Sequence, residues 1–189
     1  MRGAGPLPVS QLIADYCVKQ GAGTAFVVAG GASLHLIHAF ASHEDGRVFP
    51  VHHEQSAAMA ADGYARATRK VGVTIATSGP GATNLITGIA GAYYDSVPML
   101  CLTGQVSTSR MVGKTGVRQI GFQETPIVEM AQGITKFAVT VQRAEEIRFI
   151  LERAFFETRT GRPGPVLIDI PDDIQREKVD WDSMERFEI

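Results

Sequence analysis

Short apolar runs alternate with helix-like stretches along most of the chain. Val71–Thr77, Met99–Thr103 and Val166–Ile170 are dominated by apolar residues, a composition typical of strands that are buried on both faces. Strands separated by helices pair in parallel, and the helices cover both sides of the resulting sheet. The sequence therefore predicts a three-layer α/β/α domain with a mostly parallel sheet of about six strands. The remaining predicted strands are Phe26–Val28, Val48–His52 and Lys136–Val141.

Helices are expected between these strands. Ser10 is placed to cap the first helix and Gly21 to end it. Gly104–Phe122 has no clear period and is expected to form a long loop, and such loops are often functional. The strongest amphipathic pattern falls in residues 144–160. Further helices are expected from about Ser33 onwards and over residues 54–68, 82–94 and 123–130.

Charge and hydropathy exclude several classes of partner. The 189 residues carry a formal net charge of −2 and contain no basic run, so we expect no nucleic-acid binding. The apolar stretches are interrupted well before membrane-spanning length, and the first residues lack a signal-peptide pattern, so we expect no membrane contact and a cytoplasmic location. Cys17 and Cys101 lie in apolar segments and are expected to be buried free thiols.

Glu54 stands at the junction of a predicted strand and an Ala-rich helix. In open α/β sheets, ligands bind beyond the carboxyl ends of the strands, so this junction is a candidate site. The helix N-terminus favours the anionic form of the side chain, whereas burial favours the neutral acid. Spacing alone leaves two interpretations open: a carboxyl group with a chemical role, or an ordinary first-turn residue of a helix.

The turn Ser78–Asn84 follows another predicted strand and opens a helix. Its glycines allow close approach of the backbone to a ligand, and a helix N-terminus attracts anions. A dinucleotide site fits poorly, because Asn84 replaces the last glycine of the Gly-x-Gly-x-x-Gly pattern. The next strand also ends in Thr103-Gly104 rather than in an acid that could bind a ribose.

Two other features have ordinary explanations. His52 and His53 are neighbours on a predicted strand, where adjacent side chains point to opposite faces, so the two cannot share a metal ion. Phe122 and Glu124, at the end of the long loop, are explained well enough by core packing and by solvent exposure, respectively.

Taken in order, several segments resemble the N-terminal, pyrimidine-binding (PYR) domain of thiamine-diphosphate-dependent enzymes of the acetolactate-synthase-like branch. The resemblance covers nearly the whole chain. The matching segments are residues 53–55, 60–67, 76–84, 95–98, 103–106, 122–124 and 161–166.

The resemblance implies specific roles for residues of this chain. Glu54 matches the glutamate that hydrogen-bonds the aminopyrimidine ring of the cofactor, which promotes loss of the proton from the thiazolium carbon. Gln123 is the second expected catalytic residue, and with Phe122 it matches positions on the substrate side, where a small 2-oxo acid would bind. The residues expected to line the cofactor pocket, in addition to Glu54, are Ala29, Gly30, Gly31, Ser78, Gly79, Pro80, Gly81 and Asn84.

The resemblance also implies partners. In this family thiamine diphosphate lies between two subunits, so a second copy of the enzyme is expected across a PYR-domain dimer interface, with the partner subunit supplying a diphosphate-binding domain. Mg²⁺ would be held by that domain, and FAD is a further candidate cofactor. Helices around Ala57–Tyr64 and Leu85–Tyr94 are the candidate dimer face. Their small residues, among them Ala58, Gly88 and Gly91, would equally suit packing within the domain.

The Gly-Asp-Gly signature for magnesium and diphosphate does not occur in this sequence. We therefore expect residues 1–172 to form the pyrimidine-binding domain and residues 173–189, with no helix or strand partner, to begin an interdomain linker. The chain is then expected to be inactive alone and to be either a truncated part of a longer enzyme or, as an alternative, a separate subunit of a two-chain decarboxylase.

Three departures from acetolactate synthases leave the reaction open. Ala29 and Asp172 stand where those enzymes usually carry Pro and Lys, and the loop Ser107–Gly121 is longer. Other carboligases, lyases and decarboxylases of the branch are therefore alternatives. From other functional classes, a non-catalytic binding or regulatory module on the same fold and a nucleotide-dependent oxidoreductase domain also remain open.

Overall fold

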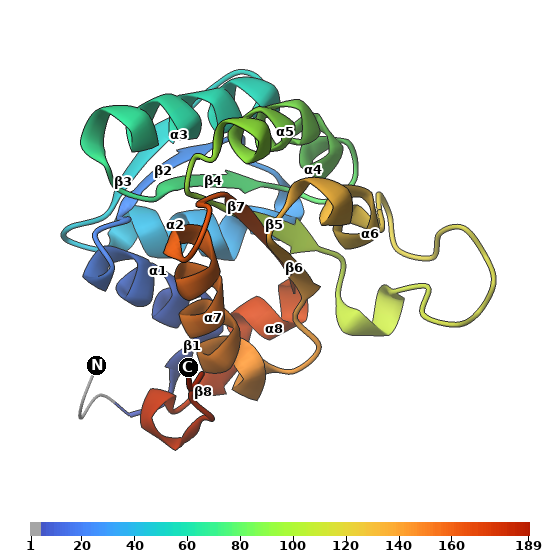
Figure 1. The fold of residues 1–189 in the computed structure, drawn as a ribbon. Coiled ribbons are helices and arrows are strands. Elements are labelled where there is room, and N and C mark those ends of the chain that lie inside the picture. The colour runs from blue at the N-terminus through green and yellow to red at the C-terminus, as the bar shows by residue number, and fades with distance from the viewer. Residues whose placement is uncertain (1–4) are drawn as a thin grey trace.

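A six-stranded parallel sheet forms the centre of the computed structural model, which describes residues 5–189 (Figure 1). Its strands are β2 (Thr24–Val27), β3 (Arg47–Pro50), β4 (Gly72–Ala76), β5 (Met99–Gln105), β6 (Phe137–Thr140) and β7 (Pro165–Pro171). The strand order is β3-β2-β4-β5-β7-β6, and every neighbouring pair is parallel. The predicted sheet of about six strands is confirmed.

Helices cover both faces of this sheet, as the three-layer prediction requires (Figure 1). No helix within residues 5–189 is long and apolar enough to cross a membrane. One face carries α1 (Val9–Lys19), α2 (Leu34–Ser42), α7 (Ile147–Arg159) and α8 (Asp172–Arg176). The opposite face carries α3 (Glu54–Thr68), α4 (Pro80–Asn84), α5 (Ile86–Asp95) and α6 (Ile127–Ala131).

Alternating side chains of the central strands supply two apolar cores, one on each face of the sheet. In β5, Leu100 and Leu102 pack with α1 and α7, whereas Met99 and Cys101 pack with α3 and α5. This is the twofold periodicity of a strand that is covered on both sides. Cys17 and Cys101 are buried free thiols, as predicted, and burial raises the pKa of each.

Two helices begin at positions other than those predicted. The first starts at Val9, directly after Pro8, so Ser10 lies inside the helix and is buried instead of capping it. The short helix expected over residues 123–130 begins only at Ile127. Gln123 has a left-handed backbone conformation (φ 61°), which an α-helix cannot accommodate.

The end of the chain differs from the prediction of a segment without helix or strand partners. Residues 172–176 form α8, and β8 (Lys178–Val179) pairs antiparallel with β1 (Leu7–Pro8). Trp181 and Met184 are buried in the core beside α1 and α7. This segment therefore packs against the domain, although its role in leading to another domain stays a prediction.

Trp181 explains why this polar segment folds back. Its ring centroid lies 5.2 Å from that of Tyr16 and 5.2 Å from the guanidinium carbon of Arg148. Nη1 of Arg148 also donates a hydrogen bond of 2.8 Å to the Trp181 carbonyl oxygen. Burying one large aromatic ring offsets the entropy lost on ordering the few polar residues around it.

We expect Trp181→Ala to lower the free energy of unfolding by about 3 kcal/mol, because it leaves a cavity between α1 and α7. Urea denaturation followed by far-UV circular dichroism measures this change. Ile189→Ala is the control, because Ile189 is 98% exposed and its truncation should have no measurable effect. Equal stability of the two variants would contradict a structural role for the packed segment.

Candidate functional site

A cavity of about 350 Å³ opens at the carboxyl ends of β4 and β5. This is the edge at which ligands bind in parallel α/β sheets. Four predicted site residues lie on its wall: Gly31, Ser78, Phe122 and Gln123. The remaining lining residues are Ala32, Thr77, Gln105, Val106, Ser107, Arg110 and Asp172.

Glu54 is the first residue of α3 and is only 8% exposed. Its Oε2 accepts a hydrogen bond of 2.9 Å from Nδ2 of Asn84, at the end of α4. The side chain of His53 caps the same helix by accepting a hydrogen bond of 3.1 Å from the backbone of Gln55. Since His53 already fills the capping role, the Glu54 carboxylate remains available for the sheltered space beside α4.

Thr77 connects this carboxylate with the cavity. A Cβ atom at Gly81 would lie 2.7 Å from Cγ2 of Thr77 and 3.2 Å from Oε1 of Glu54, and a Cβ atom at Gly30 would lie 2.5 Å from Thr77. Any larger residue at these glycines would displace Thr77 or fill the space beside Glu54. The predicted residues thus form two groups, around Glu54 and around the cavity, which meet at Thr77.

The glycine-proline turn begins with a conformation that few residues tolerate. Gly79 has a φ of 63°, and a Cβ atom there would lie 2.7 Å from Cβ of Gln123. Pro80 follows as the first residue of α4, where its missing N–H costs no hydrogen bond. The remaining predicted pocket residue, Ala29, is exposed in the turn after β2.

Phe122 is 81% exposed although it lies at the cavity wall. The side chain of Phe122 is therefore not packed into the core of residues 5–189, and the prediction of core packing is wrong. The prediction that the side chain of Glu124 points into solvent is also wrong. Its carboxylate accepts hydrogen bonds from the backbone N–H groups of Val112, Ile120 and Gly121.

Sequence reasoning missed several residues of this cavity, among them Thr77, Gln105 and Asp172. Thr77 and Gln105 lie at the carboxyl ends of β4 and β5, so their polar character within apolar strands was the available signal. Asp172 accepts a hydrogen bond of 3.2 Å from Oγ of Ser107 and lies 3.7 Å from Nε2 of His35. It therefore brings a negative charge to the cavity.

A second carboxyl group, that of Asp169, lies behind the cavity in β7. It is buried, and burial raises its pKa to about 6, although three side chains donate hydrogen bonds to it. One donor is Gln105, at 3.0 Å, and the others are Thr103 and Thr140. Three surrounding donors suit an ionised carboxylate, which accepts hydrogen bonds and does not donate them.

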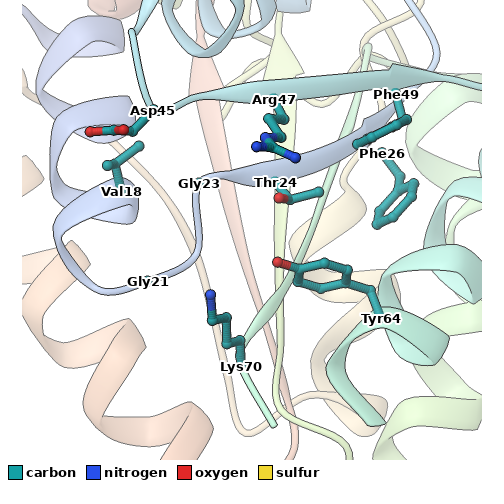
Figure 2. A pocket seen from close by; sticks show the side chains of 10 residues that line it. All are labelled: Val18, Gly21, Gly23, Thr24, Phe26, Asp45, Arg47, Phe49, Tyr64 and Lys70. Atoms are coloured by element: carbon teal, nitrogen blue, oxygen red, sulfur yellow. The ribbon is translucent and has the colours of Figure 1, made fainter. Parts of the chain in front are cut away.

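A larger cavity, of about 620 Å³, lies at the opposite, amino edge of the sheet. In Figure 2, Arg47, Tyr64 and Lys70 surround Thr24 at the start of β2. None of the residues predicted for the site lines this cavity, so size alone does not identify the candidate site. Within residues 5–189, no group of three or more His, Cys, Asp or Glu side chains is arranged to hold a metal ion.

We expect Gly81→Ala to destabilise the domain by about 1–3 kcal/mol, because the added methyl group collides with Thr77. Gly91→Ala is the matched control, because a methyl group there would point into open space. That change in α5 should stabilise the helix by about 0.5–1 kcal/mol. Thermal unfolding of both variants measures the difference, and equal effects would show that the turn does not need glycine at position 81.

Comparison with known proteins agrees with this geometry. The family described as "Thiamine pyrophosphate enzyme, N-terminal TPP binding domain" matches residues 7–132. Acetolactate synthase 2, chloroplastic, of Nicotiana tabacum is 46% identical over 184 residues, which are 96% of this chain and 27% of the relative. Acetolactate synthase, chloroplastic, of Arabidopsis thaliana is 44% identical with the same coverage.

The chain therefore spans only 27% of the length of these relatives. The residues that the family model matches include Glu54, the glycine-proline turn and the cavity wall except Asp172. The chain belongs to the family of N-terminal TPP-binding domains of thiamine pyrophosphate enzymes, and it is similar to that domain of the acetolactate synthases.

Proposed function

We propose that this chain is the cofactor-binding N-terminal domain of a thiamine-diphosphate-dependent 2-oxo acid carboligase or decarboxylase, and that Glu54 activates the cofactor. The observation that carries this proposal is the buried Glu54 carboxylate, which is bonded to Asn84 beside the glycine-proline turn. Bound thiamine diphosphate would supply a nucleophilic thiazolium carbon for attack on the carbonyl group of the 2-oxo acid.

The surroundings of Glu54 suit the binding of an aminopyrimidine ring. Asn84 engages Oε2, and within residues 5–189 no side chain donates a hydrogen bond to Oε1. This second oxygen lies beside Gly81, where the lack of a Cβ atom leaves space. Glu54 could therefore hold or share a proton with a ring nitrogen in a site that is largely shielded from water.

The remaining predicted residues take supporting roles in this proposal. The backbone of residues 29–31 and 78–81 would contact the pyrimidine ring, since Gly31 and Ser78 line the cavity. Phe122 and Gln123 lie on the same wall and would face the small 2-oxo acid. Asp172 gives this wall a negative charge, whereas a lysine would give it a positive one. This favours a substrate-binding region that differs from that of an acetolactate synthase.

A complete catalytic centre would require further parts. We propose that the diphosphate and Mg²⁺ are held by a diphosphate-binding domain of a partner subunit, and that FAD is an additional candidate ligand elsewhere in the enzyme. The chain alone would then be inactive.

We further propose that the outer surfaces of α3 and α5 form the dimer face. Met59 and Tyr94 are exposed on these helices, so their apolar surface is available for contact with a second copy of the enzyme. Ala58 and Gly88 have a different role, because they pack against each other inside the domain: a Cβ atom at Gly88 would lie 2.4 Å from Cβ of Ala58. Gly91 is exposed and could lie in the interface.

The cellular location is a separate proposal. We propose the cytoplasm as the location, as the sequence pattern predicts. The plant relatives carry chloroplastic in their names, so fractionation of cells that produce the protein is the direct test.

In the assembled enzyme, we expect Glu54→Gln to slow exchange of the thiazolium proton for deuterium by at least about 100-fold. The amide keeps the size of the side chain and can still accept the bond from Asn84, but it cannot take up the proton. Proton NMR of quenched cofactor measures the rate. The control is Glu145→Gln, an exposed position on the far side of the sheet; near-normal exchange in Glu54→Gln would remove Glu54 from the mechanism.

For the chain of residues 1–189, we expect weak or no binding of thiamine diphosphate in the presence of Mg²⁺, because only the pyrimidine half of the site is present. Isothermal titration calorimetry gives the dissociation constant. Tight, magnesium-dependent binding would show that this chain holds the diphosphate as well, contrary to the proposed division between subunits.

A further inference from the structure

We propose that Gln105, Asp169 and Glu124 are positioning residues that fix the loop 106–125 and hold Gln123 against the Gly79 turn. This inference deepens the proposed function, because Gln123 lies on the wall of the proposed site. None of the three positioning residues needs to contact the cofactor or the substrate. They fix the conformation of the loop: Gln105, oriented by Asp169, holds its two ends, and Glu124 holds its interior.

Asp169 orients Gln105. The Asp169 carboxylate is fixed in β7 by hydrogen bonds from Thr103 and Thr140, of 2.7 and 3.3 Å. It accepts a further bond of 3.0 Å from Nε2 of Gln105 at the end of β5. Since a buried carboxylate accepts but does not donate, it selects the orientation in which the amide nitrogen of Gln105 points toward β7.

Gln105 in turn joins the two ends of the loop. Its Nε2 also donates a hydrogen bond of 3.0 Å to the carbonyl oxygen of Thr125, and its Oε1 accepts one of 2.9 Å from the backbone of Val106. The side chain is 2% exposed, so water does not readily replace these bonds. One oriented amide therefore connects the first and last parts of a segment of about 20 residues.

Glu124 organises the interior of the loop. Its Oε1 accepts a hydrogen bond from the backbone N–H of Val112, and its Oε2 accepts bonds of 3.2 and 3.4 Å from Ile120 and Gly121. Bonds from several backbone N–H groups to one carboxylate are strong because the acceptor is charged. The loop thus has fixed geometry despite its length and its lack of regular structure.

Gln123 shows why such fixation is needed. Its φ of 61° is a left-handed conformation that is unfavourable for a side chain of this type, and it persists only when neighbouring structure enforces it. Gln123 stands next to Glu124, and its Cβ lies 2.7 Å from where a Cβ of Gly79 would be. The strained residue therefore lies between the positioning residues and the turn of the proposed site.

Hydrogen exchange monitored by mass spectrometry tests the loop contacts in this chain. Gln105→Met keeps the volume of the side chain but removes its three hydrogen bonds, and we expect exchange of amides in residues 106–125 to accelerate by roughly tenfold or more. Gln175→Met is the matched control, because Gln175 is also buried but bonds to Ala32 and Ile170 outside the loop. Equal loop exchange in the two variants would overturn the proposal.

Thermal unfolding tests whether Gln105 enforces the strain at Gln123. We expect Gln123→Gly to raise the Tm of the otherwise unchanged chain by about 2–4 °C, because glycine tolerates the left-handed conformation. In the Gln105→Met background the loop can relax, so the same substitution should give no rise. An equal rise in both backgrounds would contradict the proposal. Should Gln105→Met fail to fold, Glu124→Gln provides the second background.

Neither measurement requires thiamine diphosphate. The proposed function would fail if Glu54→Gln left thiazolium proton exchange unchanged, and that result would not alter the loop exchange or the Tm coupling. Conversely, unchanged loop exchange in Gln105→Met would overturn the positioning role without bearing on Glu54. The two failures are therefore distinguishable.

Discussion

The close approach of three chain segments around Thr77 is the constraint on which the candidate site depends. Glycine at positions 30 and 81 lets the turn after β2 and the start of α4 reach this threonine without collision. The backbone N–H of Ala32 also donates a hydrogen bond of 3.3 Å to its hydroxyl. Without these contacts, the carboxylate of Glu54 and the cavity at the sheet edge would be separate features.

Two buried carboxyl groups, those of Asp169 and Glu54, have different surroundings. Asp169 is surrounded by donors, which suits a fixed acceptor inside the protein. Glu54 has one side-chain donor, Asn84, and a second oxygen beside a glycine. The first arrangement stabilises structure, whereas the second leaves hydrogen-bonding capacity for a ligand. This difference supports the separate positioning and chemical roles that we propose.

Much of the fold could be predicted from the sequence because buried parallel strands such as β4, β5 and β7 consist of apolar residues throughout. The position of Glu54 beside the glycine-proline turn was likewise inferred from the order of motifs. Contacts between distant segments were not predictable: nothing local in Gln105 indicates that it reaches Thr125, or that Glu124 folds the loop inward. The packing of Trp181 was missed because one aromatic residue within a charged segment gives no periodic signal.

The antiparallel pair of β1 and β8 has a mechanical consequence. Leu7 pairs with Val179 at the end of the pair from which the chain continues toward both termini. Tension between the termini would therefore separate the pair one residue at a time, in the manner of a zipper, while the central sheet remained unloaded. A pull transmitted through attached polypeptide would first detach the packed segment around Trp181 and then open this small pair, before it reached the geometry around Glu54.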